Sequence, residues 1–152
     1  MENQTANDQK RNNADALICL YKNAHIALQA ISNVLGEVDD VMLKQQLAAS
    51  YDGYEKMIGN LSTLMAEMGV MPKEPNFFKK AMLWGSSKMS AMKDNSVSHI
   101  AGMMIQGTVM GSNEIRELLS ASGAVLDERV VTAANDLLAY EEEQEKAWKA
   151  LA

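Results

Sequence analysis

Two polar side chains near the C-terminal end of the chain interrupt an otherwise apolar stripe. Glu141 and Gln144 are three residues apart in a stretch of strong helix formers, so a helix would place both on one face. An inward carboxylate and amide are the kind of groups that hold a metal ion or a polar ligand inside a helical bundle. If the helix is instead phased on Leu138, Glu141 rotates to the surface.

Three tyrosines occupy positions that can face this stretch. Tyr51 and Tyr54 are also three residues apart, and counting back through a short turn places Tyr21 near them. Phenol hydroxyls can partner a buried carboxyl, which needs hydrogen bonds once it leaves water. We therefore expect Tyr21, Tyr51, Tyr54, Glu141 and Gln144 to form an inward polar cluster. The cluster either fixes the helix register or lines a small pocket that binds a ligand.

The elements that would position these residues are four long helices. Apolar residues recur in steps of three and four from residue 14 to Gly36, from a cap at Asp39 or Asp40 to Gly69, from a cap at Asn95 or Ser96 to about Gly123, and after Asp127. The predicted inward residues of these helices, in chain order, are Leu17, Leu20, Ala24, Leu28, Ile31 and Leu35, then Leu47, Tyr51, Tyr54, Ile58, Leu61, Met65 and Met68, then Ile100, Met104, Gly107, Thr108, Gly111, Ile115 and Leu118, and finally Val130, Ala134, Leu137, Glu141, Gln144, Trp148 and Leu151.

The chain is predicted to form one all-α domain over residues 1–152. Short loops make the helices pack as two antiparallel hairpins, which gives a four-helix bundle. Pro72 and Pro75 mark a crossover segment, residues 70–95, with an additional helix over about 75–93. The polar residues 1–12 are expected to be disordered.

Composition excludes several classes of protein. The formal net charge of −6 argues against sequence-independent binding of nucleic acid, which requires a cationic surface. No apolar run reaches the length of about 18 residues that a membrane-spanning helix needs. A single cysteine, Cys19, cannot form an intrachain disulfide, and the polar N-terminus has no signal-peptide pattern. We expect a cytoplasmic protein without a membrane span.

The helix layout resembles the ferritin-like superfamily, in particular small bacterial members with a helical crossover between hairpins and without the di-iron ligands. The resemblance covers about residues 14–151 and rests on helix lengths and phases. Di-iron members carry Glu on the first and third long helices and Glu-x-x-His on the second and fourth. At the corresponding positions, the first helix here has about Tyr21 and Ala24, and the second has Tyr51 and Tyr54. The third has about Thr108, beside Gly107, and the fourth has Glu141 and Gln144.

Glu141 is thus the one carboxylate at these positions, and neither histidine is present. Neutral tyrosine, threonine and glutamine are poor substitutes as iron ligands. The resemblance therefore implies a bundle that has lost the di-iron chemistry, and we predict no bound metal and no cofactor.

The remaining chemically capable residues have simpler interpretations. His25 and His99 lack a ligand-spaced partner, so both are predicted to lie at the surface or at its boundary. Cys19 is predicted to be a buried, inert thiol. Glu114 and Glu117 are expected on a solvated helix face.

Methionine and glycine leave two further questions open. The twelve methionines suit a core, but on the crossover helix, next to Phe77 and Trp84, they would also suit a partner surface. Gly107 and Gly111 would allow close helix approach, or leave space for a ligand.

The leading functional hypothesis is a non-catalytic bundle with a structural or protein-interaction role. It would form homo-oligomers and could bind a protein partner through the crossover helix. One alternative is a di-metal oxidase or iron-storage protein that uses iron or manganese. The other is a bundle that binds a small ligand in a cavity bordered by Glu141, Tyr54 and Gly107.

Overall fold

The structure, a computed structural model, describes residues 2–72 and 96–152. Its helices are α1 (Glu2–Leu35), α2 (Val41–Glu67), α4 (Val97–Ser122) and α5 (Glu128–Leu151), with a 3₁₀ turn, η1 (Gly123–Val125), between the last two. The described part is therefore all-α, as predicted. The predicted crossover helix over about 75–93 lies outside the described residues, as does most of the 70–95 segment.

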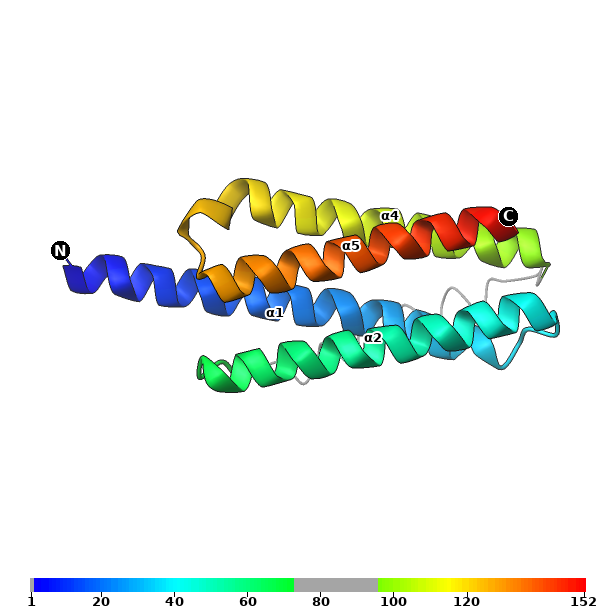
Figure 1. Ribbon diagram of the computed structural model, residues 1–152, viewed down its shortest axis with the longest axis horizontal. Coiled ribbons are helices and arrows are strands. Elements are labelled where there is room, and N and C mark those ends of the chain that lie inside the picture. The colour runs from blue at the N-terminus through cyan, green and yellow to red at the C-terminus, as the bar shows by residue number, and fades with distance from the viewer. Residues whose placement is uncertain (1, 73–95) are drawn as a thin grey trace.

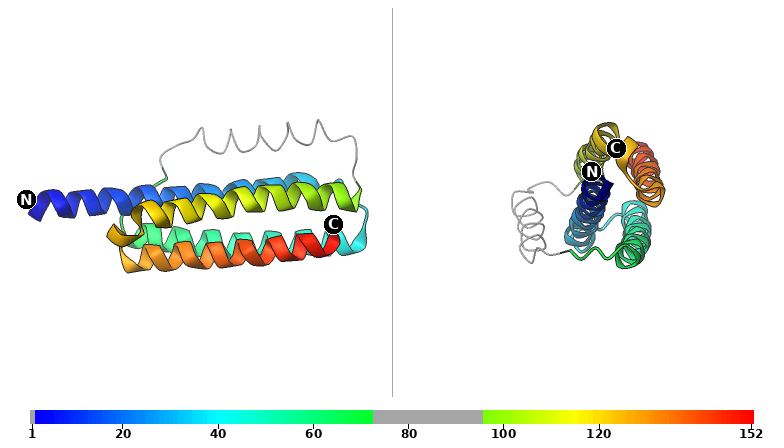
Figure 2. Two further views of the ribbon diagram at one scale, coloured as in Figure 1. Left: turned by 90° about the horizontal axis from the view of Figure 1, so that it is seen from above. Right: turned by 90° about the vertical axis from the view of Figure 1, so that its left-hand side faces the viewer.

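The four helices pack as two antiparallel hairpins. α1 packs mainly along α2, and α4 mainly along α5 (Figure 1). The view along the bundle in Figure 2 shows the four helices around a common centre. Among the described helices, none combines the length and the hydrophobicity needed to cross a membrane.

Capping residues account for the helix ends. The side chain of Asp40 accepts a hydrogen bond from Leu43 N at 2.9 Å, and that of Ser96 accepts one from His99 N at 3.3 Å. α2 ends beside Gly69, whose φ of 68° is the left-handed conformation that glycine adopts without strain. The cap and stop signals in the sequence were therefore confirmed at these positions.

Removing the α2 cap should destabilise the protein measurably. Asp40→Ala leaves the Leu43 N–H without its acceptor, and we expect a loss of about 1 kcal/mol in the free energy of unfolding. Urea denaturation followed by circular dichroism would measure it. Asp39→Ala is the matched control, because Asp39 is exposed and does not cap the helix. Equal effects of the two substitutions would contradict the assignment of the cap.

The N-terminus differs from the sequence-based expectation. Residues 1–12 were expected to be disordered, but α1 begins at Glu2 and its first turns project past the end of the bundle (Figure 1). Once the packed part of α1 is formed, each further residue adds a hydrogen bond without a new nucleation cost. The exposed pair of Asp8 and Arg11, 3.4 Å apart, lies on this extension.

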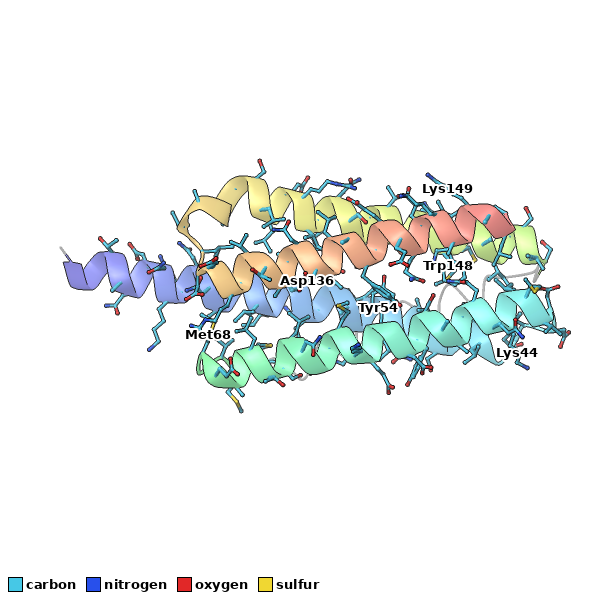
Figure 3. All side chains as sticks on the ribbon, viewed as in Figure 1. Lys44, Tyr54, Met68, Asp136, Trp148 and Lys149 are labelled. Carbon is cyan, nitrogen blue, oxygen red and sulfur yellow. The ribbon has the colours of Figure 1, made fainter. Side chains whose placement is uncertain are left out.

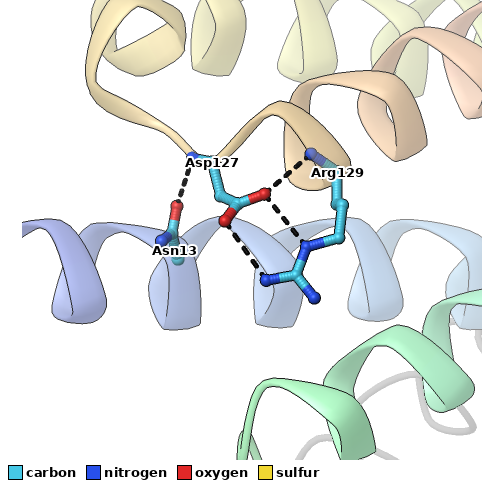
Figure 4. Close-up of polar contacts among 3 residues, drawn as sticks. All are labelled: Asn13, Asp127 and Arg129. Carbon is cyan, nitrogen blue, oxygen red and sulfur yellow. Dashed lines mark hydrogen bonds and ion pairs between the residues drawn. The ribbon is translucent and has the colours of Figure 1, made fainter.

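Asn13 marks the point where α1 enters the bundle. Its Oδ1 accepts a hydrogen bond from Asp127 N at 2.8 Å, and Asp127 in turn caps α5 at Arg129 N and pairs with the Arg129 side chain (Figure 4). The start of α5 is thereby tied to α1.

The core follows the predicted stripes closely. The largest fully buried side chains include Trp148, Leu17, Leu20, Ile31, Leu43, Leu47, Met65, Ile100, Ile115 and Leu137. One predicted inward residue, Gly107, is exposed instead, and a Cβ built on it would meet nothing within 4 Å. On α4 the inward stripe advances in steps of four, through Met104, Thr108 and Ser112, which turns Gly107 outward.

Candidate functional site

The five residues predicted to form the inward cluster are not equally buried. Glu141, at 1 % exposure, and Tyr54 and Gln144 are buried, whereas Tyr21 and Tyr51 are half-buried. The inward stripe of α5 runs through Leu137, so the alternative phasing on Leu138 was wrong.

Gln144 belongs to a polar contact between α2 and α5. Its Oε1 accepts a hydrogen bond from the Ser50 hydroxyl and another from Gln46 Nε2 at 3.2 Å. Gln46 Nε2 also lies 3.3 Å from Ser50 Oγ. Sequence analysis did not single out Gln46 or Ser50, although both fall within one turn of the Leu47 stripe position. The amide of Gln144 is therefore engaged by α2 (Ser50 is buried) and ties the two hairpins together.

Tyr140 forms a second contact between the same helices. Its hydroxyl donates to the backbone carbonyl of Ser50 at 3.2 Å and occupies space above Gly53, where a Cβ would lie 1.8 Å from the oxygen. The rings of Tyr140 and Tyr54 meet edge to face, with centroids 5.0 Å apart. Figure 3 shows Tyr54 on α2 on the side toward α5. The glycine thus provides the space for the aromatic pair.

A side chain at position 53 should displace Tyr140. In Gly53→Ala the new methyl group would overlap the phenol, so the ring must leave and lose its hydrogen bond and its contact with Tyr54. We expect a net loss of about 1 kcal/mol, because the better helix propensity of alanine, worth about 1 kcal/mol, offsets part of the cost. In a Tyr140→Ala background the same change should stabilise the protein. Urea denaturation of the wild type, the two single variants and the double variant measures both effects. If the losses of the two single variants simply add in the double variant, the clash is contradicted.

Glu141 packs against α4 at a glycine. A Cβ on Gly111 would lie 2.9 Å from Glu141 Oε2, closer than a normal contact, so the glycine lets the carboxyl pack directly against α4. From α1, Asn23 Nδ2 donates to Gly111 O at 3.1 Å. Three buried oxygens of this region have no hydrogen-bond partner in the described part of the chain: Asn23 Oδ1, Ser112 Oγ and Glu141 Oε2.

Burial controls the ionisation of Glu141. Desolvation raises the pKa of its carboxyl to about 8, and the carboxylate of Glu114 adds to the rise. The guanidinium of Arg116 opposes the rise, but it donates to Glu142 Oε1 at 2.9 Å rather than to Glu141. At neutral pH, Glu141 is therefore mainly a neutral carboxylic acid and can donate a hydrogen bond.

The prediction that the tyrosines surround Glu141 was wrong. In the part of the chain that the structure describes, no tyrosine hydroxyl hydrogen-bonds to its carboxyl. Tyr54 is close enough for the Glu141 charge to contribute, after burial, to a raised pKa of the phenol. Tyr21 instead packs edge to face on His25, with ring centroids 4.4 Å apart. The predicted cluster thus divides into an α2–α5 contact around Gln144 and a separate region around Glu141, which was not foreseen.

The residues at the ferritin-like ligand positions do not fit a di-metal centre. The Thr108 hydroxyl donates to Met104 O of its own helix at 2.6 Å, which engages its proton. The raised pKa of Tyr54 keeps its phenol neutral, and Glu141 is itself mainly protonated near neutral pH. Over residues 2–72 and 96–152, no three His, Cys, Asp or Glu side chains gather closely enough to hold a metal ion.

Cys19 is held in its protonated form. Its thiol donates to Glu114 Oε1 at 3.1 Å, and burial together with this carboxylate raises the thiol pKa to about 12. A thiol that is not ionised at neutral pH is a weak nucleophile. Glu114 is exposed as predicted, but its carboxylate also accepts this hydrogen bond from α1. His99 is exposed near the start of α4, also as predicted.

A small surface hollow lies on the α2–α5 side. Its volume of about 60 Å³ suits a few water molecules rather than an organic ligand. No residue of the predicted cluster borders it; its lining is Met57, Asn60, Leu61, Ala133, Asp136 and Leu137.

Comparison of the chain with protein-family models, with curated proteins and with solved structures found no significant match in any of the three. The family is therefore not assigned by similarity. What holds for the described residues is an all-α bundle of four helices, arranged as two hairpins.

Proposed function

We propose that this protein is a non-catalytic bundle on a ferritin-like plan, with a structural or protein-interaction role. The observation that carries the proposal is that inward polar groups form hydrogen bonds between helices. Ser50, Gln46 and Gln144 satisfy one another across α2 and α5, and Tyr140 bonds the backbone of α2. Groups engaged in this way hold helices in register, which is the work of a scaffold.

The partner we propose is a second copy of the chain. Val41 and Met42 stand next to each other at the start of α2 and are 66 % and 63 % exposed, and Met110 on α4 is also largely exposed. Burying such side chains against another molecule is favourable, by about 25 cal/mol for each Å² of apolar surface removed from water.

Sedimentation velocity at micromolar concentration tests this assembly. We expect a dimer or larger species, and we expect either the double substitution Val41→Lys and Met42→Lys or the single substitution Met110→Lys to dissociate it. Ala139→Lys, at an exposed position of α5, is the control and should leave the assembly intact. A monomeric wild-type protein would refute self-association as the role.

Elemental analysis separates this proposal from the metal-dependent alternative. An oxidase or iron-storage protein would retain iron or manganese after metal loading and lose it on Glu141→Ala. The non-catalytic proposal expects no stoichiometric metal in either protein. Metal bound in the wild type and lost in the variant would overturn it.

A further inference from the structure

Three helices bring buried oxygens without a hydrogen-bond partner in the described structure to the same part of α4. Asn23 of α1, Ser112 of α4 and Glu141 of α5 are 5 %, 1 % and 1 % exposed, and each has a buried oxygen without a hydrogen-bond partner in the described structure. Asn23 and Glu141 both contact Gly111, and Ser112 is the next residue. Buried polar groups in folded proteins nearly always have a hydrogen-bond partner, so three unpartnered oxygens close to one residue of α4 require a physical reason.

The chemistry of these groups favours one protonation state of the carboxyl. An amide oxygen can only accept a hydrogen bond, and a carboxylate would add further acceptors and a charge. The Ser112 hydroxyl can donate one hydrogen bond, and Asn23 Nδ2 already donates to Gly111 O. A protonated carboxyl adds a further donor beside the unpartnered Asn23 Oδ1 and carries no charge. The neutral form of Glu141 therefore matches its surroundings, whereas the ionised form does not.

Within residues 2–72 and 96–152, the charged groups around Glu141 give its ionised form no paired counter-ion. On α4 the nearest ones are Glu114, which repels a carboxylate, and Arg116, which is exposed and paired with Glu142. α2 presents Tyr54, which is neutral. α1 presents the uncharged amide of Asn23 at Gly111; its Cys19 thiol is held by Glu114, and His25 packs on Tyr21.

We propose that Glu141 is a proton-operated latch between α5 and α4. With its proton, the carboxyl stays packed against Gly111 and closes the seam between the two helices. Without it, the carboxylate is buried beside unpartnered oxygens and must move toward water, which opens the seam locally. The bundle would thus loosen around the middle of α5 as the solution becomes alkaline.

An NMR titration with hydrogen exchange tests the latch directly. In the wild type, the ¹³C shift of the Glu141 carboxyl should titrate with a midpoint of about 8. Between about pH 6.5 and 9, protection of the amides of residues 138–145 should fall by about tenfold relative to Glu141→Gln at the same pH. Glu143→Gln, an exposed neighbour on the same helix, should behave as the wild type. A Glu141 midpoint near 4.5, or equal loss of protection in Glu141→Gln, would overturn the proposal.

A second pair of variants keeps the test independent of the folding of Glu141→Gln. Gly111→Ala places a methyl group 2.9 Å from Glu141 Oε2, closer than a normal contact, so the carboxyl must shift away from α4 and its midpoint should fall below about 8. Gly107→Ala, at an open and exposed position one turn away, should leave the midpoint unchanged. Equal midpoints in Gly111→Ala and the wild type would overturn the latch.

Discussion

Glu141→Gln should remove a pH dependence of stability that we expect of the wild-type protein between about pH 4.5 and 8. The folded-state pKa of this carboxyl is raised from 4.5 to about 8, so the folded protein retains a proton that the unfolded chain has released. Within this window the free energy of unfolding falls as pH rises, by about 1.4 kcal/mol per pH unit for one such group. The contribution is fully present below the unfolded value of 4.5 and is lost once pH passes the folded value of about 8.

The measurement is the difference between wild type and variant, because other carboxyls titrate in the acidic part of the window. Urea denaturation at several pH values should show this difference changing by on the order of 3 kcal/mol between about pH 5.5 and 8, in favour of Glu141→Gln at the higher pH. The glutamine remains neutral, and its amide hydrogens can be donated to oxygens in this region. Glu143→Gln should reproduce the wild-type profile. Parallel profiles for the wild type and Glu141→Gln would contradict the burial of a protonated carboxyl.

Trp148→Ala should be among the most destabilising single substitutions in the chain. Among the described residues, Trp148 is the largest fully buried side chain, and it packs in the core near the C-terminal end of α5 (Figure 3). Truncating a buried tryptophan removes its transfer free energy and leaves a cavity, which together cost about 3–5 kcal/mol. For a domain of this size that is a large part of the total stability, so the variant should unfold at a much lower urea concentration or fail to fold.

Lys149→Ala is the matched control for this substitution. Lys149 follows Trp148 directly but is exposed, and its ammonium pairs with Glu145 at 3.1 Å on the surface of α5. Exposed pairs of this kind contribute about 0.2–1 kcal/mol. Circular dichroism of both variants would compare the losses. A loss for Trp148→Ala as small as that for Lys149→Ala would show that the end of α5 is not packed into the core.

Much of the fold follows from local pattern. The stripe of α5 already indicates that Glu141 and Gln144 share the face of Leu137 and Trp148, because residues three and four apart lie together on any α-helix. Asp40, Ser96 and Asp127 cap their helices through backbone N–H groups two or three residues away, so these ends are also encoded locally. The N-terminal extension of α1 was missed because the polarity of residues 1–12 suggests disorder, whereas a helix already formed by packing can propagate into them.

The partners of each inward side chain were decided by the tertiary structure. A stripe specifies which face a helix buries, but it says nothing of the axial shift and rotation that bring two stripes together. Those two quantities place Gly111, and not Gly107, opposite Glu141. They also bring Ser50 into hydrogen-bond distance of Gln144, and they place Gly53 against the Tyr140 ring. They also keep the tyrosine hydroxyls off the Glu141 carboxyl.

The carboxyl and amide of α5 therefore have two different roles that their spacing could not distinguish. The sequence by itself determined that Glu141 and Gln144 share one face of a helix, since helical periodicity is a property of the local chain. The structure decided that this face, phased on Leu137 and not on Leu138, points into the bundle. Only the packing of the other helices decided that the Gln144 amide oxygen accepts hydrogen bonds from α2, whereas Glu141 is enclosed at Gly111 with no ion-pair partner among the described residues. This enclosure is why the pKa of Glu141 rises, and it depends on contacts between residues more than 25 positions apart.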